Sequence, residues 1–422
     1  MLTALILFIA MYILLLMLPK FRPWIALGFA ALFLILGILP VSDILGSINF
    51  NVLMMIAGTM GIVSMFIDSG MPALMADVIV DKMPNVKWTI VALALFAGIV
   101  SAFVDNVATV LMIAPVAIAI AKKFDISPVA MVIAISVSSN LQGAATLVGD
   151  TTAILLGGYA DMTFMDFFVF HGKMGIFWAV ELGAVLTAAV LLYLFRKETQ
   201  PTIGKDRTVV TDYVPSILLA GTVLLLIIAS FIPNTPENIN GYICMTLLII
   251  GIIYNVIKKH SLVGLTKPVK EIDYETLLLL TGLFIVISGI THAGVIDAIS
   301  ALFLKIGSGN LFLIYTLIVW FSVFISAFID NIPYVATMLP VVQGIALNMG
   351  VEPYVLYFGL LIGATLGGNL TPIGASANIT AIGMLQREGY LVKTKDFTRI
   401  GIPFSLVAVM SGYILIWLVW GM

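Results

Sequence analysis

The sequence is poor in charge and in chemically reactive side chains. Only 10% of its 422 residues are charged, against about 25% in a soluble domain. Its one cysteine, Cys244, excludes an intrachain disulfide and a cysteine metal site. Its three histidines lack the spacing of a metalloprotease motif, and the net charge of −2 points to no nucleic-acid partner. We therefore expect no catalytic residues and no cofactor, and we do not predict an enzyme.

Long apolar runs fill the chain from end to end, and 61% of its residues are hydrophobic. Runs of this length cross a bilayer core of about 30 Å as helices, and the short alternating segments of a membrane barrel are missing. The predicted fold class is an all-α polytopic membrane protein. We expect about ten transmembrane helices, two of them discontinuous, together with two re-entrant helical hairpins. Such a chain has the lipid bilayer itself as a partner.

Two apolar stretches, 88–121 and 311–348, carry an Asp-Asn pair near their middle, in SAFVDN and in SAFIDN. Lysines flank the first stretch on both sides, so both ends are expected on the same side of the membrane. An arm of about 16 residues covers roughly 24 Å as a helix, which is short of the bilayer core. Each stretch is therefore predicted to be a re-entrant hairpin with the Asp-Asn pair at its tip.

Two other apolar segments, 128–158 and 354–386, are interrupted by glycine and hydroxyl residues, in GAATLVGDTTAI and GNLTPIGASANI. Glycine and proline interrupt helices, and the backbone groups that they free must be buried or line a cavity. We interpret both segments as discontinuous helices.

The two halves of the chain repeat. Asn51–Gly70 resembles Glu275–Gly294, Ser101–Pro115 resembles Ser326–Pro340, and the Gly-Thr-Gly spacing of the first break recurs in the second. The matching segments occur in the same order in both halves and are separated by nearly the same number of residues, which indicates a single internal repeat. An odd number of crossings in each half inverts the second copy. We predict a first repeat over 1–200, a cytoplasmic linker over 201–212 and an inverted second repeat over 213–422.

The positions of the basic residues give the orientation. When the first span starts outside, every lysine and arginine except Lys173 and Lys305 falls in a segment predicted to be cytoplasmic. The chain is thus predicted to lie in the cytoplasmic (inner) membrane with both termini outside.

The tips and the breaks carry the candidate binding residues. A carboxylate at the centre of a membrane helix costs roughly 2.5–3.5 kcal/mol, so one that occurs twice at equivalent positions suggests a function. Capping is the simpler interpretation of each pair, since Asp and Asn favour helix N-caps. The duplication, and the Gly-Thr-Gly break that follows each pair, favour ion binding, with which capping is compatible. The predicted substrate- or ion-binding residues are Ser101, Asp105, Asn106, Thr109, Thr146, Gly149, Asp150, Thr151, Ser326, Asp330, Asn331, Asn369, Thr371, Gly374, Ser376 and Asn378.

Oxygen ligands of this kind suit a hard cation such as sodium. A buried carboxylate can also carry a proton, since low-dielectric surroundings disfavour its charged form. The coupling ion is therefore predicted to be sodium or a proton. Two sodium sites are expected, the first at Ser101, Asp105, Asn106 and Gly149, and the second at Ser326, Asp330, Asn331 and Gly374. A further membrane carboxylate, Glu181, has no assigned role.

These motifs resemble the ion transporter superfamily of secondary carriers, and within it the arsenite permeases, NhaD-type sodium/proton antiporters and P proteins. The resemblance spans nearly the whole chain and is most specific at SAFVDNVATVLMIAP, SAFIDNIPYVATMLP, GAATLVGD and GGNLTPIGASAN. In the related sodium/dicarboxylate carriers the tips read Ser-Asn-Thr, and the tips and loops bind sodium and the substrate carboxylate. Here Asp105 and Asp330 take the serine positions, and Thr151-Thr152-Ala153 replaces the Pro-Pro-Asn common in the first loop of the branch.

The resemblance implies a homodimeric secondary transporter that moves a small ion, anion or oxyanion by alternating access. A sodium/proton antiporter is the alternative. A sodium-coupled dicarboxylate carrier is disfavoured because the aspartates at both tips repel anions. A channel is disfavoured by the inverted repeat, and an intramembrane enzyme by the lack of a nucleophile–base arrangement.

Overall fold

Helices make up nearly all of the regular structure. The computed structural model describes residues 1–124, 126–201, 207–259 and 263–422, so residues 202–206 of the predicted linker lie outside the described part. The first half contains α1 (Leu2–Met17), α2 (Arg22–Ile35), α3 (Ile44–Ser47), α4 (Phe50–Asp68), α5 (Met71–Asp81), α6 (Val86–Ser101), α7 (Asn106–Lys123), α8 (Val129–Gly143), α9 (Thr151–Tyr159) and α10 (Ile176–Leu194). Before α10, a small antiparallel pair joins β1 (Val169–Phe170) to β2 (Lys173–Met174).

The second half follows the same order. It contains α11 (Val214–Ser230), α12 (Ile239–Lys259), α13 (Val263–Lys270), α14 (Tyr274–His292), α15 (Val295–Gly307), α16 (Leu311–Ser326), α17 (Asn331–Met349), α18 (Tyr354–Gly367), α19 (Ser376–Arg387) and α20 (Thr394–Trp420). Short 3₁₀ turns occur at Pro19–Phe21, Val41–Asp43, Met165–Phe167 and Gly368–Leu370.

Several helices are long and apolar enough to cross a membrane. Seven in the described part of the chain qualify singly, and up to nine if the bent pairs α1–α2 and α15–α16, which turn by 118° and 115°, each count as one span. The seven include α7 and α17, whereas α1, α2, α11 and the members of the broken helices are each too short to qualify singly. The predicted all-helical polytopic fold is confirmed. The return arms α7 and α17, with 18 and 19 residues, are longer than the sequence suggested and pass the length test by themselves.

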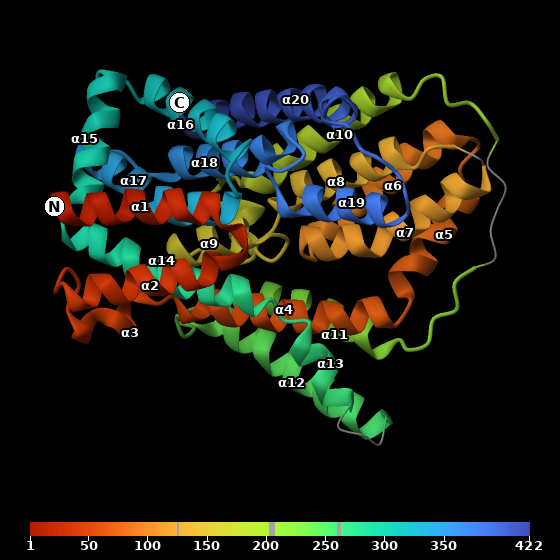
Figure 1. Cartoon of the computed structure of the whole chain (residues 1–422), viewed down its shortest axis with the longest axis horizontal. Coiled ribbons are helices and arrows are strands. Elements are labelled where there is room, and N and C mark those ends of the chain that lie inside the picture. Colours follow the sequence, from red (N-terminus) through yellow and green to blue (C-terminus); the bar gives the residue numbers. More distant parts are fainter. Residues whose placement is uncertain (125, 202–206, 260–262) are drawn as a thin grey trace.

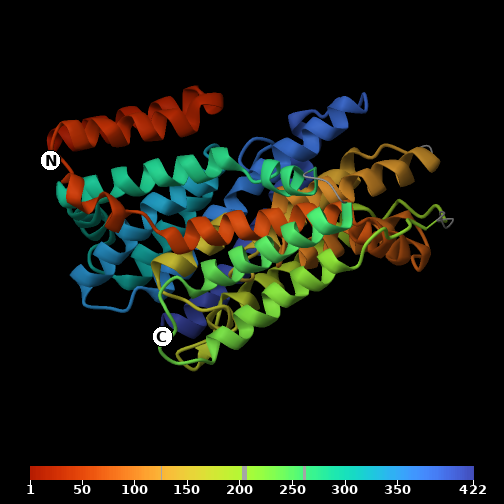
Figure 2. The same ribbon diagram turned by 90° about the horizontal axis from the view of Figure 1, so that it is seen from below.

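Equivalent helices lie at opposite ends of the molecule, as an inverted repeat requires. Figure 1 shows α5 at the right end and its counterpart α15 at the left end. Within each half the same neighbours pack together, α6 on α8 in the first and α16 on α18 in the second. Figure 2 shows α1 along one edge of the molecule, where it also contacts α2 and α14.

The two halves interlock through equivalent glycines. Helix α12 packs on α4, and α2 packs on α14. A Cβ atom at Gly58 of α4 would lie 2.6 Å from the backbone carbon of Cys244, and one at Gly282 of α14 would lie 2.6 Å from that of Ala26. Only a residue without a side chain allows helices to approach so closely. These glycines, which match in the repeat, therefore hold one half against the other.

Candidate ion-binding site

Both Asp-Asn pairs stand where a helix begins. Asp105 is the N-cap of α7, and its Oδ1 accepts hydrogen bonds from the backbone N–H groups of Val107 and Ala108, at 3.0 and 3.2 Å. Asp330 caps α17 in the same way, accepting from the N–H of Ile332 at 3.1 Å. Capping satisfies N–H groups that would otherwise lack partners inside an apolar bundle. It uses only Oδ1 of each carboxylate, so capping leaves the second oxygen of each for another role.

The helix breaks lie directly against these tips. Helix α8 ends at Gly143 and α9 begins at Thr151, and the same interruption separates α18 from α19. A Cβ atom at Gly149 would lie 2.5 Å from the carbonyl oxygen of Gly143 and 2.7 Å from that of Ser101. One at Gly374 would lie 2.6 Å from that of Gly368 and 2.8 Å from that of Ser326. Glycine is therefore needed at both positions for the loop to reach the tip.

Threonines fasten each loop to its tip. The hydroxyl of Thr146 donates to the carbonyl oxygen of Ala102, and that of Thr371 donates to the equivalent carbonyl oxygen of Ala327. The repeat is thus preserved down to single hydrogen bonds, and each tip and its loop form one polar unit.

A cavity of about 350 Å³ brings residues of both halves together. It lies between the two tips and extends to the ends of α4 and α14, where Asp68 and Asp273 line it. Six of the predicted site residues line this cavity: Asp105, Asn106, Asp150, Thr151, Asn331 and Ser376. Residues of the two halves, far apart in the sequence, therefore meet in one place, although the repeat alone does not require this.

The other predicted residues sit around this cavity. Thr109 is fully buried and donates to the carbonyl oxygen of Val104 at 3.4 Å. Ser101 and Ser326 are also fully buried, one turn before the tips. Apart from Asp330, which is described below, the remaining predicted residues shape the loops or join them: Thr146, Gly149, Asn369, Thr371, Gly374 and Asn378.

The cavity carries more negative than positive charge. Asp105 and Asp150 line it, and within the described ranges neither forms an ion pair with a lysine, arginine or histidine. Lys267 also lines the cavity, and its Nζ lies 2.6 Å from Oδ1 of Asp68. Glu271 adds another carboxylate at the same end. Such surroundings attract cations and repel multiply charged anions.

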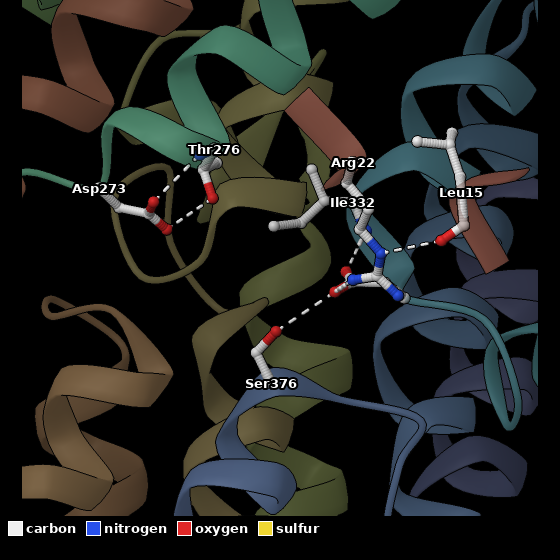
Figure 3. Close-up of polar contacts among 7 residues, drawn as sticks. Leu15, Arg22, Asp273, Thr276, Ile332 and Ser376 are labelled. Atoms are coloured by element: carbon white, nitrogen blue, oxygen red, sulfur yellow. Dashed lines mark hydrogen bonds and ion pairs between the residues drawn. The ribbon is translucent and has the colours of Figure 1, made fainter. Parts of the chain in front are cut away.

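An arginine near the N-terminus, which was not among the predicted site residues, reaches the second tip. The guanidinium Nη1 of Arg22 lies 3.0 Å from Oδ2 of Asp330, and its Nε donates to the carbonyl oxygen of Leu15 at 3.2 Å. Figure 3 shows Arg22 and Ser376 approaching this carboxylate from two sides, and the Ser376 hydroxyl donates to Oδ2 at 3.3 Å. The contact spans 308 positions of sequence, and no local pattern marks it.

A buried chain of amides connects the two halves. Asn106 donates to Oδ1 of Asn140 at 2.9 Å, and Asn140 in turn donates to Oδ1 of Asn369 at 3.1 Å. Beyond it, the hydroxyl of Ser136 donates to Oδ1 of Asn378 at 2.6 Å. Asn140 and Ser136 were not predicted as site residues. Asn140 stands three residues before the first break. This position is the only feature of the sequence that could have marked it as a site residue.

A second cavity, of about 830 Å³, lies at the other end of α4 and α14. Asn49, Asp161, Glu237, His292 and Pro340 are among the residues that line it. Helices α9 and α17 contribute to both cavities, near the tips in the first and further along in the second. The described chain has no group of three or more His, Cys, Asp or Glu residues that could hold a metal ion, so a bound cation would take part of its ligands from hydroxyl, amide or carbonyl oxygens.

The apolar spans, the inverted repeat and the polar cavity between its halves define a membrane transporter. Residues 12–363 match the model of the CitMHS family, described as citrate transporter, and the chain belongs to this family within the ion transporter superfamily.

One sequence relative is named as a transporter, and another is a P protein. An uncharacterized transporter of Mycobacterium tuberculosis is 30% identical over 439 residues, which cover 98% of this chain and 97% of the relative. The P protein of Homo sapiens is 26% identical over 452 residues, covering 86% of this chain and 53% of its own. The predicted resemblance to the superfamily and to P proteins is confirmed.

Two solved structures share the fold. The YdaH transporter of Alcanivorax borkumensis superposes with a TM-score of 0.65 at 14% identity, covering 90% of this chain and 86% of its own. MtrF of Neisseria gonorrhoeae, described with a class of antimetabolite efflux pumps, gives a TM-score of 0.57 at 15% identity, covering 89% of this chain and 83% of its own.

Proposed function

We propose that this membrane transporter is a secondary active carrier that moves a small ion or oxyanion by alternating access, coupled to sodium or protons. The observation that supports this most is the cavity in which tips and loops of both halves meet. Its volume of about 350 Å³ suits a small solute, near the lower end of the range of roughly 300–1,000 Å³ for ligand sites. The second cavity, at the other end of α4 and α14, supports the second access route that we propose for such a mechanism.

The charges in the cavity restrict which substrates can bind there. Citrate, which the family description names, carries several carboxylates at neutral pH. Asp105 and Asp150 line the cavity without a cationic partner in the described part of the chain, so the cavity offers a multiply charged anion no compensating cation at these positions. A free polycarboxylate is therefore a poorer fit than a neutral or weakly charged oxyanion species such as arsenite. The same two carboxylates favour sodium/proton antiport as a second candidate function.

The proposed arrangement in the membrane follows the predicted orientation. The end of the first cavity that Lys267 and Asp273 line then faces the cytoplasm, and the second cavity faces outside. We further propose that the protein assembles as a homodimer in the cytoplasmic membrane.

Transport by the purified full-length protein in proteoliposomes tests this function. Citrate transport, arsenite transport and sodium/proton exchange would be measured in turn, each with an imposed sodium or proton gradient. We expect accumulation that depends on one gradient and falls at least tenfold in the Asp105→Asn variant. Asp297→Asn, an exposed aspartate on α15, is the matched control and should leave transport unchanged. Transport that is equally fast after both gradients are collapsed would contradict the proposal and support a channel.

A further inference from the structure

The two tips have nearly the same sequence but different surroundings. We propose that only the first tip exchanges a monovalent cation, and that Arg22 is a tethered cation that compensates Asp330 at the second tip. This inference rests on the proposed cation coupling and refines it, since the sequence predicted a sodium site at both tips.

At the second tip both carboxylate oxygens are engaged. Oδ2 of Asp330 accepts from Nη1 of Arg22 and from the hydroxyl of Ser376, while Oδ1 accepts from the backbone N–H of Ile332. The Asp330 side chain is only 12% exposed and Arg22 is 26% exposed, so water screens the pair weakly. The backbone carbonyl of Leu15 holds the guanidinium in place. A mobile cation would have to displace a fixed one.

At the first tip the equivalent groups are free. Oδ2 of Asp105 has no hydrogen-bond partner within the described ranges, where Oδ1 alone caps α7. The hydroxyl of Ser101 is fully buried and also lacks a partner among the residues described, whereas its counterpart Ser326 donates to the carbonyl oxygen of Ala364. A buried polar group without a partner costs free energy, so an unpartnered hydroxyl one turn before a free carboxylate oxygen points to a ligand.

A second carboxylate distinguishes the first tip further. Asp150 follows Gly149 and lines the cavity with Asp105, but the residue after the equivalent Gly374 is Ala375. The first half therefore brings two carboxylates to its tip and the second half brings one, which Arg22 already neutralises.

The repeat explains why Asp105 lacks an arginine of its own. Gly58 packs on Cys244 as Gly282 packs on Ala26, so Cys244 and Ala26 occupy equivalent places on α12 and α2. One helical turn earlier on each helix stand Asn240 and Arg22. The counterpart of Arg22 is thus a neutral amide, and the inverted copy supplies no tethered cation.

Carboxylate, hydroxyl and carbonyl oxygens at the first tip are ligands for sodium, and two neighbouring carboxylates can share a proton. The other ionisable groups that line the cavity are Asp68, Lys267, Glu271 and Asp273. The exchanged species is therefore a sodium ion or a proton, and the two arms of the test separate them.

The first arm counts radioactive sodium bound per chain by the purified full-length protein at saturation. We expect one ion for the wild type, none for Asp105→Asn, and one for the charge-neutral double variant Arg22→Gln/Asp330→Asn. Arg22→Gln alone should release the carboxylate of Asp330 and raise the number to two. Two ions in the wild type, or none in a folded double variant, would overturn the inference.

The second arm applies if the wild type binds no sodium. The pH dependence of transport, measured in sodium-free choline buffer, should be lost in Asp105→Asn and kept in the double variant. If both lose it, or both keep it, the inference is wrong. Sodium counting needs no gradient, so a single ion that Asp105→Asn abolishes would uphold this inference even if gradient-driven transport failed. Coupled transport with two sodium ions would uphold the proposed function alone.

Discussion

The side-chain amide of Asn106 donates to Oδ1 of Asn140 over 2.9 Å, and this hydrogen bond connects the first tip to the amide chain that joins the two halves. Asn140 is fully buried, and its own nitrogen also reaches the carbonyl oxygen of Thr365 at 2.8 Å. Truncating it leaves several buried polar groups without partners, each of which costs about 1–3 kcal/mol.

The Asn140→Ala variant is therefore expected to lose several kcal/mol of its free energy of unfolding and most of its transport. Thermal unfolding in detergent and uptake in proteoliposomes measure the two effects. Asn348→Ala, at an exposed asparagine of α17, serves as the control. Normal stability of Asn140→Ala would show that the amide chain has no structural role.

Glycines between the two halves should tolerate no side chain. In Gly58→Ala and Gly282→Ala the new methyl group meets backbone atoms at 2.6 Å, which cannot move aside as a flexible side chain does. We expect each variant to lose about 1–3 kcal/mol of stability through overpacking.

Gly221→Ala provides the matched control for these two variants. Gly221 lies inside α11, and a Cβ atom there would meet nothing within 4 Å. Because alanine favours helix more than glycine, this variant should be as stable as the wild type or more so. Equal melting temperatures for all three variants would refute close packing between the halves.

Glycines of the broken helices affect function more than folding. Gly149→Ala and Gly374→Ala would push each loop away from its tip, since the added carbon would lie 2.5 and 2.6 Å from a carbonyl oxygen. We expect transport to fall more than tenfold in each, because misplacing a binding group by about 1 Å is already severe. Gly383→Ala on α19, where a Cβ atom has open space, should transport normally. Uptake by each variant, normalised to the amount of folded protein, measures the effect.

The single cysteine makes the orientation testable by labelling. Cys244 is fully buried, so the wild type should not react with a membrane-impermeant maleimide. In intact cells the reagent should label the Ser47→Cys variant, which lines the second cavity, and spare Thr276→Cys, which lines the first. Inside-out vesicles should give the reverse pattern. Labelling of Thr276→Cys from outside would invert the proposed topology.

Repetition is what made the meeting of the tips and the breaks predictable from sequence. The tips and breaks occur twice with the same spacing, so Asp105, Asn106, Asn331 and Ser376 could be expected near one another, and the structure places all four on one cavity. The helix boundaries at Ser101 and Asn106 likewise follow from a capping residue after an apolar run.

Contacts between helices that are distant in the sequence could not be predicted from such local patterns. Arg22 stands at the start of a span among other basic residues, where the sequence indicates only that it faces the cytoplasm. Its role depends on how α2 lies against α14 and on where α17 begins, and packing of whole helices determines both. Asn140 is a similar case, because its partners lie on other helices.

The interlocked halves have a consequence for how the protein is made. The ribosome synthesises α4, residues 50–68, long before α12, residues 239–259, which finally covers it. Until then the face of α4 that carries Gly58 lacks its partner helix, and α2 likewise lacks its partner until α14 is inserted. The first repeat therefore cannot complete its packing during its own synthesis. Its helices reach their final contacts only after the second repeat has entered the bilayer.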